Sequence, residues 1–402
     1  MQTQIHINFQ SSNFATQADE ILRRCVHCGF CNATCPTYQL LGDELDGPRG
    51  RIYLIKQMLE TGQSTSETQT HLDRCLTCLN CETTCPSGVE YGKLVSIGRQ
   101  ISSEQVPRAV HKQFIRWAMR QVLSRREWMV PLIKLAAFVR PVLPGSLQRQ
   151  LPRRQQLNHD DGQTLQHHLR TVILPAGCAQ QAFAAEINQH CRTLLNKIKV
   201  TAVEISSDGC CGALSEHLTA QDEAQRQMKQ NIDAWWPQIE NGAEAIISTA
   251  SACGLMIKDY AHLLATTDYA EKANRVSAMC QDISEFLMNE DLSELPDASN
   301  QRIAVHTPCT LQHGQGIQGN INHLLEQRGY HLTHVDDAHL CCGSAGSYAI
   351  LQRSISQKLL HNKVNNLLAD TPDTIATANI GCLLHLRSGT PVQVLHWLQL
   401  LN

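Results

Sequence analysis

Eight cysteines in the first quarter of the chain fall into two runs with the same spacing. Each run reads C-x2-C-x2-C-x3-C and is followed at once by proline. Two-residue gaps let three consecutive thiolates converge on a short loop, and this spacing is typical of cubane iron–sulfur clusters. The sequence therefore predicts two [4Fe-4S] clusters. The runs are Cys25, Cys28, Cys31 and Cys35 before Pro36, and Cys75, Cys78, Cys81 and Cys85 before Pro86.

The fourth cysteine of each run is expected to bind the cluster of the other run. It lies on the turn that leads into a helix, too far round the loop to reach the cluster of its own run. We therefore assign Cys25, Cys28, Cys31 and Cys85 to one cluster, and Cys75, Cys78, Cys81 and Cys35 to the second.

Structural zinc and disulfide bonds are the alternatives for these cysteines. A zinc site pairs two C-x2-C elements and gains nothing from a third and fourth cysteine in one run. Disulfides need an oxidising compartment, and residues 1–17 are polar, without the apolar core of an export signal. No stretch reaches the ~18–20 apolar residues of a spanning helix. We expect a cytoplasmic protein, either free or on the cytoplasmic face of the inner membrane.

The 402 residues suffice for about two or three domains, and local composition suggests where they divide. Between the two runs, residues 42–51 are rich in Gly, Pro and Asp, which predicts a turn, with a helix beginning near Pro48. Arg49 and Arg51 either hold this loop and moderate the charge of a reduced cluster, or are ordinary surface and capping residues. The predicted divisions are 1–104, 105–165, 166–295 and 296–402.

Residues 105–156 form a strongly basic connector, with 11 Lys and Arg against the single acid Glu127, in a chain whose formal net charge is −3. Val110, Phe114, Trp117 and Ala118 follow helical spacing and predict one apolar stripe. A basic amphipathic segment with tryptophans can lie on an anionic membrane, and it can equally pack against partner subunits or link two domains. No nucleic-acid-binding signature accompanies the charge, so we expect no nucleic-acid partner.

A long internal repeat follows the connector. Four cysteines recur in register, two of them adjacent and followed by glycine, at offsets of 131, 131, 131 and 129 residues. Short apolar segments precede the first and last cysteine of each copy, at 171–174, 243–247, 302–305 and 374–377, with helical stretches at 220–236 and 354–368. The cysteines are Cys178, Cys210, Cys211 and Cys253 in the first copy, and Cys309, Cys341, Cys342 and Cys382 in the second.

Strands that alternate with helices predict a parallel sheet in each copy. The predicted fold class is α+β overall: a mainly helical, ferredoxin-like domain with two [4Fe-4S] clusters, followed by two repeated α/β domains with parallel strands. The repeat cysteines would lie at the carboxyl ends of strands, where open α/β sheets build their sites. They are either buried thiols or a site for a further cluster, a thiol relay or an electron-accepting pocket.

The repeats resemble the cysteine-rich CCG domains of heterodisulfide reductase, anaerobic glycerol-3-phosphate dehydrogenase and lactate-utilisation proteins. Nearly the whole chain resembles the iron–sulfur subunit of bacterial glycolate oxidase, in Pro36–Arg51, Leu72–Cys78, Asn231–Trp236, Pro308–His313 and Cys341–Gly346. In the heterodisulfide reductase type, the last cysteine of each repeat belongs to a C-x2-C pair. Here Ala250 and Asn379 occupy the partner positions, so four cysteines remain per repeat.

The resemblance implies an electron-transfer subunit that works with flavoprotein subunits to convert glycolate to glyoxylate, with a quinone or similar acceptor. We find no glycine-rich nucleotide motif after a strand, so FAD is expected on a partner subunit and no catalytic residue is assigned to this chain. The alternatives are the equivalent subunit of a lactate or glycerol-3-phosphate dehydrogenase, a thiol–disulfide reductase, and a non-enzymatic iron or redox sensor.

Overall fold

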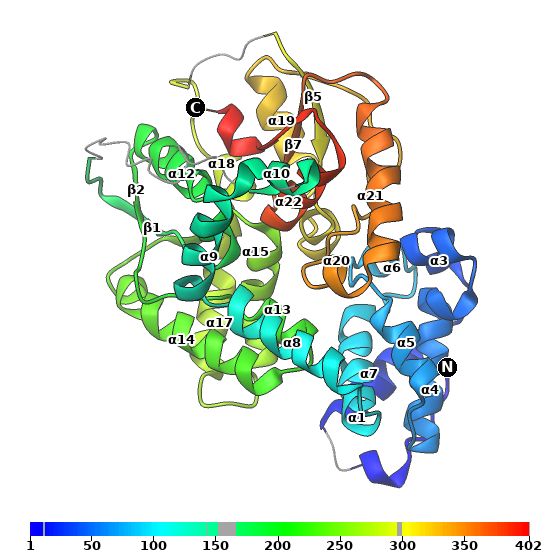
Figure 1. Cartoon of the computed structure of the whole chain (residues 1–402). Coiled ribbons are helices and arrows are strands. Elements are labelled where there is room, and N and C mark those ends of the chain that lie inside the picture. Colours follow the sequence, from blue (N-terminus) through cyan, green and yellow to red (C-terminus); the bar gives the residue numbers. More distant parts are fainter. Residues whose placement is uncertain (11–12, 143, 152–165, 296–299, 402) are drawn as a thin grey trace. The chain divides into compact units, whose positions relative to one another are not determined.

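The computed structural model describes residues 1–10, 13–142, 144–151, 166–295 and 300–401. They form two compact units. Unit 1 comprises Met1–Arg116 together with His339–Lys363, and unit 2 comprises Trp117–Ala338 and Val364–Asn402. In the described part of the chain, unit 1 consists of helices and turns, and the strands belong to unit 2 (Figure 1). The predicted domain limits at 104, 165 and 295 stay predictions.

Four longer helices of unit 1 enclose its core. Helix α4 packs against α5 and α7, and α1 packs against α7. The core side chains Leu22, Ile55, Leu72 and Leu94 are fully buried. Short helices carry the cysteine runs between these longer ones. The elements are η1 (Ile7–Phe9), α1 (Asn13–Arg24), α2 (Phe30–Ala33), α3 (Pro36–Leu41), η2 (Glu44–Asp46), α4 (Pro48–Thr61), α5 (Ser66–Asp73), α6 (Asn80–Thr83), α7 (Tyr91–Gln105) and α20 (Tyr348–Leu351).

The turn before α4 is tightly packed against the helix. Pro48 occupies the first position of α4, which confirms the predicted start and suits a residue with fixed φ and no N–H. Gly50 lies against the preceding turn: a Cβ there would stand 2.1 Å from the Glu44 carbonyl oxygen and 2.8 Å from the Leu45 Cα. This close approach places the loop Asp43–Gly47 beside the first turn of α4.

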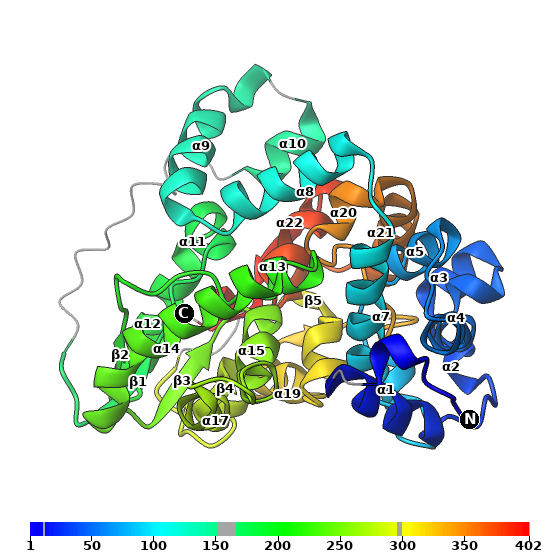
Figure 2. The ribbon, with the colours of Figure 1, turned by 90° about the horizontal axis from the view of Figure 1, so that it is seen from below.

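Unit 2 contains two four-stranded sheets, and every strand pair in them is parallel. The first sheet has the order β2-β1-β3-β4, which can be followed in Figure 2, and the second has the order β6-β5-β7-β8. The strands are β1 (Arg170–Ile173), β2 (Val200–Val203), β3 (Ala245–Ser248), β4 (Cys280–Asp282), β5 (Arg302–His306), β6 (His331–Leu332), β7 (Thr374–Thr377) and β8 (Gln393–His396).

The equal strand orders show that the sequence repeat is a repeat of structure, and they confirm the predicted fold class. All four predicted apolar segments are strands, and β3 and β7 are buried along their whole length, as expected for the inner strands of parallel sheets. The helices of the repeats are α11 (Ala179–Phe183), α12 (Glu186–Lys197), α13 (Ala213–His217), α14 (Gln221–Glu240), α15 (Ser251–Lys258), α16 (Tyr260–Leu263), α17 (Ala270–Met279), α18 (Ile283–Leu287), α19 (Asn320–Gln327), α21 (Arg353–Leu368) and α22 (Ile380–Gly389), with η5 (Thr310–Gly314) and η6 (Trp397–Leu400).

Helix α14 is longer than the sequence predicts, because it continues through Pro237 to Glu240. A proline in a helix forfeits the hydrogen bond of its own nitrogen and crowds the preceding turn. The following turn is nevertheless retained, since the Asn241 N–H donates to the Pro237 carbonyl over 3.1 Å.

The part of the connector that the structure describes forms the helices α8 (Val110–Leu123), α9 (Arg126–Phe138) and α10 (Gly145–Gln150), with η3 (Arg140–Val142) between the last two. In unit 2, α9 packs against α11 and α10 against α22. The predicted stripe on α8 is helical but exposed at Val110, Phe114 and Trp117. No helix in the described ranges is both long and apolar enough to span a membrane.

Several basic residues of the connector contact groups within the protein. Arg108 and Arg116 both contact Asp73. Arg120 pairs with Glu223 at 3.0 Å. Arg126 lies 3.3 Å from the buried Asp208 carboxylate, and Arg149 donates to the Arg387 and Ser388 carbonyls. The basic residues therefore fasten the connector to each unit.

We predict that Gly50→Ala destabilises the full-length protein. Its methyl group would meet backbone atoms of Glu44 and Leu45 that cannot rotate away, and overpacking of this kind costs about 1–3 kcal/mol. Thermal unfolding followed by circular dichroism would show a lower midpoint. Gly145→Ala is the matched control, because its Cβ would meet only the Arg149 Nη1 atom at 3.9 Å. Equal midpoints for the two variants would contradict the packing argument.

Candidate metal centre

The first candidate centre is a hollow of about 440 Å³, counted to its solvent mouth. The loop after α1 carries Cys25 and Cys28, and it turns back through two residues with positive φ, His27 at 59° and Gly29 at 85°. The lining contains all four cysteines predicted for one cluster: Cys25, Cys28, Cys31 and Cys85. The structure therefore brings a cysteine of the second run to the first three cysteines of the first run.

The second candidate centre is a hollow of about 290 Å³ built in the same way. Thr77 and Leu79 have φ of 53° and 61°, and they turn the loop after α5 as His27 and Gly29 turn the loop after α1. The lining contains the four cysteines of the other predicted set: Cys35, Cys75, Cys78 and Cys81. Cys81 and Tyr91 line both hollows.

The spacing of the sulfurs fits a multi-iron core better than a single ion. Four thiolates around one tetrahedral zinc lie about 3.8 Å apart, since each Zn–S bond is ~2.3 Å. Among the described residues, no three of these eight sulfurs lie within 4.8 Å of one another. In a cubane cluster each thiolate binds its own iron atom, so the donor set of each hollow suits [4Fe-4S]. Which sulfur binds which cluster stays a prediction.

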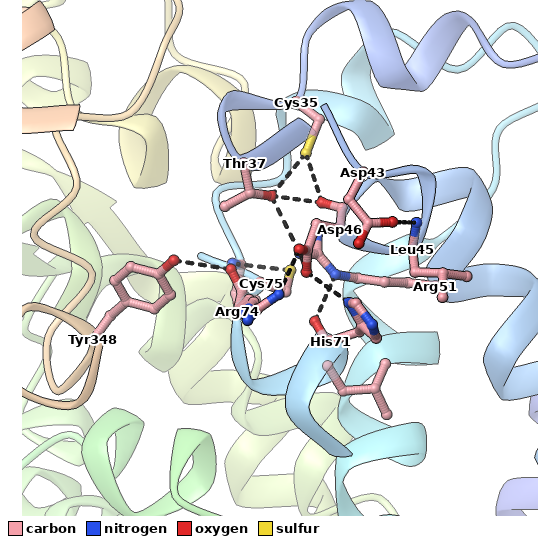
Figure 3. Close-up of polar contacts among 12 residues, drawn as sticks. Cys35, Thr37, Asp43, Leu45, Asp46, Arg51, His71, Arg74, Cys75 and Tyr348 are labelled. Atoms are coloured by element: carbon pink, nitrogen blue, oxygen red, sulfur yellow. Dashed lines mark hydrogen bonds and ion pairs between the residues drawn. The ribbon is translucent and has the colours of Figure 1, made fainter. Parts of the chain in front are cut away.

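Polar groups contact two sulfurs of the second centre, and Figure 3 shows Thr37 beside Cys35. The Tyr91 hydroxyl donates to Cys75 Sγ over 3.6 Å, the Thr77 N–H donates to the same sulfur over 3.4 Å, and the Thr37 hydroxyl contacts Cys35 Sγ at 3.2 Å. Hydrogen bonds to cluster sulfurs stabilise the more negative, reduced state. This centre is therefore placed to accept an electron.

Positive charge acts on the same sulfurs. Burial by itself raises the pKa of Cys75, but the guanidinium groups of Arg51 and Arg99, together with the hydrogen bonds from Thr77 and Tyr91, lower it below its usual value. Arg99 is held in place by hydrogen bonds to the Leu72 and Cys75 carbonyls, at 3.1 and 2.6 Å. The thiolate that a metal needs is thus favoured in a buried site.

The first centre has a different environment. Cys28 is exposed, and burial together with the nearby Cys25 raises the pKa of Cys31 to about 11. Arg49, which lines this hollow, pairs with Glu44 at 2.5 Å, and both side chains are more than a third exposed. Arg49 thus has the surface role that the sequence allowed for, whereas Arg51 is buried.

Sequence reasoning missed several polar residues of the second centre, namely Asp46, His71, Arg74, Tyr91 and Arg99. Asp46 lies in the loop that was predicted only as a turn, and its carboxylate contacts His71 and Arg74 at 2.9 and 2.8 Å. Arg74 directly precedes Cys75, and His71 is one helical turn earlier. That adjacency was the available signal, but only the fold shows that they meet Asp46.

The cysteines of the first repeat gather within unit 2. Cys178 precedes α11 and its thiol lies 3.6 Å from Cys210 Sγ. Cys211 is hydrogen-bonded to Cys210 and Cys253, and the bond to Cys253 and burial raise its pKa. Gly212, with φ of 94°, provides the left-handed turn that starts α13 directly after the pair.

The second repeat divides its cysteines between the units: Cys309 and Cys382 belong to unit 2, and Cys341 and Cys342 belong to unit 1. Asn379, which stands where the heterodisulfide reductase type has cysteine, donates from Nδ2 to Cys382 Sγ over 3.6 Å. The residue that departs from the pattern therefore supports a sulfur instead of supplying one.

Two cysteine-lined hollows on a helical unit, with two cysteine-rich parallel α/β repeats, define an iron–sulfur electron-transfer protein. Family models agree: a 4Fe-4S dicluster domain matches residues 21–89, and a cysteine-rich domain named CCG matches residues 172–258 and 303–387.

Full-length relatives give the family. The chain is 46% identical to the glycolate oxidase iron-sulfur subunit of Escherichia coli (strain K12), over all of this chain and 98% of that protein. It is 28% identical to the probable glycolate oxidase iron-sulfur subunit of Bacillus subtilis (strain 168), over 97% and 94% of the two chains. The chain belongs to the family of glycolate oxidase iron–sulfur subunits.

Two more distant matches add detail. Lactate utilization protein A of Geobacillus kaustophilus is 26% identical over 58% of this chain and 98% of that protein. The crystal structure of a hypothetical protein from Helicobacter pylori has a TM-score of 0.58 with 9% identity, covering 98% of this chain and 72% of that one. This second likeness concerns the fold alone.

We predict that paired cysteine substitutions reveal the exchange of the fourth cysteine. If Cys35 serves the second centre, Cys35→Ser combined with Cys78→Ser damages one cluster and leaves about four of about eight iron atoms. Cys35→Ser combined with Cys28→Ser then damages both clusters. Iron and sulfide content and EPR of the reduced, anaerobically prepared protein give the measurement.

The opposite pattern would show that each run binds its own cluster. In that case the Cys35 and Cys28 pair retains about four iron atoms, and the Cys35 and Cys78 pair retains none. Cys191→Ala serves as the control, because Cys191 is a buried thiol of α12 outside both runs.

Proposed function

We propose that this chain is the iron–sulfur electron-transfer subunit of a glycolate oxidase complex. It would pass electrons from a flavoprotein subunit, which oxidises glycolate to glyoxylate, toward a quinone-type acceptor. The observation that carries the proposal is the pair of four-cysteine hollows in a chain that aligns from end to end with glycolate oxidase iron-sulfur subunits.

The chemistry divides naturally between subunits. Oxidation of a 2-hydroxy acid removes two electrons together, and a flavin accepts them as a pair and releases them singly. Iron–sulfur clusters carry one electron each. In such a complex the side chains of this protein hold the clusters, set their potentials and exclude water, while the reaction at carbon takes place on the partner.

The first centre is the better placed of the two to receive electrons from a partner. Cys28 is exposed, and the side chains on either side of it, Val26 and Phe30, are 69% and 64% exposed. Electron-transfer partners use small contact surfaces, and an exposed cluster ligand within an apolar patch suits one. We assign entry of electrons to this face.

A lactate dehydrogenase complex is the second candidate. The alignment with lactate utilization proteins supports it, although that alignment covers only 58% of this chain. The residues described here hold clusters and do not select a substrate, so the choice of glycolate rests on the 46% identity.

Contact with the cytoplasmic face of the inner membrane is part of the proposal. Trp128, Leu132, Leu135 and Val142 recur along one side of α9 and η3 and are exposed. Because the neighbouring arginines are engaged in unit 2, an apolar surface remains, with less free charge than the composition suggests. A Trp-bearing apolar face is suited to the membrane interface.

We expect glycolate to reduce the clusters only when the flavoprotein partners are present. Purified chain and reconstituted complex would be mixed anaerobically with glycolate, D-lactate or glycerol 3-phosphate, and cluster reduction followed by EPR and visible absorbance. Reduction by glycolate in the complex, and none in the chain alone, is the expected result. Reduction by glycerol 3-phosphate but not by glycolate would refute the substrate assignment, and flavin bound tightly to the lone chain would refute the division of labour.

Replacing the α9 stripe should weaken membrane binding. Trp128→Ser with Leu135→Ser removes apolar area worth about 25 cal/mol per Å², so co-sedimentation of the full complex with vesicles of bacterial lipids should fall and depend little on salt. Met288→Ser is the control, since Met288 is 41% exposed in α18's cap. Unchanged sedimentation, with loss of the flavoprotein instead, would assign the stripe to subunit contact.

A further inference from the structure

A buried charge network lies beneath the second centre (Figure 3). The side chains of Arg51 and Asp46 are both 1% exposed, and their closest charged atoms, Nη2 and Oδ1, are 3.6 Å apart. The Asp46 carboxylate makes its short contacts elsewhere, through Oδ1 to His71 Nδ1 at 2.9 Å and through Oδ2 to Arg74 at 2.8 Å. Two guanidinium groups thus share one carboxylate: that of Arg51 is buried, and that of Arg74 is 34% exposed.

Arg51 directs that charge toward the cysteines. Its Nε donates to the His71 carbonyl over 2.8 Å, which fixes the side chain, and its Nη2 donates to the Thr37 hydroxyl over 3.2 Å. The Thr37 hydroxyl donates to the Asp46 carbonyl over 2.7 Å, and its oxygen lies 3.2 Å from Cys35 Sγ. One hydroxyl group therefore separates a buried guanidinium from a predicted cluster ligand.

Among the described residues, the first centre has no buried guanidinium of this kind. The positive charges near it are the Met1 ammonium, which donates to the Cys25 carbonyl over 2.7 Å, and Arg49. Arg49, which lines that hollow, forms an ion pair with Glu44 in which both side chains are more than a third exposed. Solvent screens such a pair, and its two charges largely cancel at the distance of the sulfurs. The two hollows therefore have the same cysteine pattern and different electrostatics.

We propose that Arg51, acting partly through Thr37, raises the reduction potential of the centre at Cys35, Cys75, Cys78 and Cys81 above that of the centre at Cys25, Cys28, Cys31 and Cys85. Each reduction adds one negative charge to a cluster, and a fixed positive charge stabilises that state most where the dielectric is low. We call the second centre, with Cys35, the inner centre, and the first centre, with Cys28, the outer centre. The inner centre is then the electron store.

The order of the two reduction potentials gives electron flow a direction. This direction rests on the proposed function. One electron leaves the reduced outer centre, which returns to its oxidised state, and the oxidised inner centre gains it. The donor to the outer centre is the reduced flavin of the partner. Arg51 is a tuning residue in this scheme: it lines the hollow of the second centre and donates to Thr37, and its role is to set a potential.

The test is a redox titration of the reconstituted full-length chain, with each centre followed by EPR. Arg51→Met should lower the equilibrium constant for reduction of one centre at least tenfold, which lowers its potential by about 59 mV for one electron. The potential of the other centre should not change. Arg51→Lys keeps the charge and should restore most of the shift. Arg49→Met is the matched control and should move neither centre by that amount.

Two further variants identify the centre and protect the test against misfolding. A Cys35→Ser background is expected to retain only the first centre, and Arg51→Met should then have no effect on the remaining signal. Thr37→Val removes the hydroxyl without removing the charge, and it should lower the potential of the inner centre by less than Arg51→Met. If the Arg51→Met protein fails to hold clusters, the potentials measured in Thr37→Val and Arg51→Lys test the proposal in its place.

The proposal is overturned if both centres shift equally, if the outer centre alone shifts, or if Arg51→Met and Thr37→Val leave both potentials unchanged with clusters intact. A purely structural Arg51 would give cluster loss in Arg51→Met with no shift in Thr37→Val. These measurements need neither substrate nor partner, so their failure leaves the proposed function standing. Failure of the glycolate assay, conversely, leaves the order of potentials intact.

Discussion

The structure of unit 1 depends on one constraint: the fourth cysteine of each run lines the hollow that holds the first three cysteines of the other run. Cys35 lies with the second run and Cys85 with the first, so neither site is complete until the two halves have packed. The core between α4, α5 and α7 provides that packing, and metal binding is in turn expected to stabilise the packed state. Folding and cofactor assembly are therefore coupled in this unit.

Equal cysteine spacing does not produce equal sites. The loops turn through positive φ at corresponding positions, His27 with Thr77 and Gly29 with Leu79, so the backbone repeats. The surroundings differ, because the second site is covered by buried polar side chains and by the segment that carries Tyr348, whose hydroxyl donates to the Arg74 carbonyl over 3.0 Å. The potential of a cluster depends on charge, hydrogen bonds and exposure, so two centres with different roles arise from one motif.

The connector shows why net charge is a weak guide to partners. Its composition favours an anionic surface, yet the structure uses Arg108, Arg116, Arg120 and Arg126 to hold the connector to carboxylates within each unit. What α9 presents outward is mainly apolar. The surface available to a partner or a membrane is thus decided by which charges have already been paired.

The sequence by itself determined the features that depend on local spacing. These are the two cysteine runs, the repeat, the parallel α/β strands of both copies and the start of α4 at Pro48. Such features rest on neighbours within a few residues or on direct comparison of one copy with the other. Tertiary structure alone decided that Arg51 is buried while Arg49 is partly exposed, although two positions separate them, because burial depends on which side of α4 faces the core. It also decided that Asp46, His71 and Arg74 form one network, since these residues are up to 28 positions apart and meet only when the loop before α4 packs against α5.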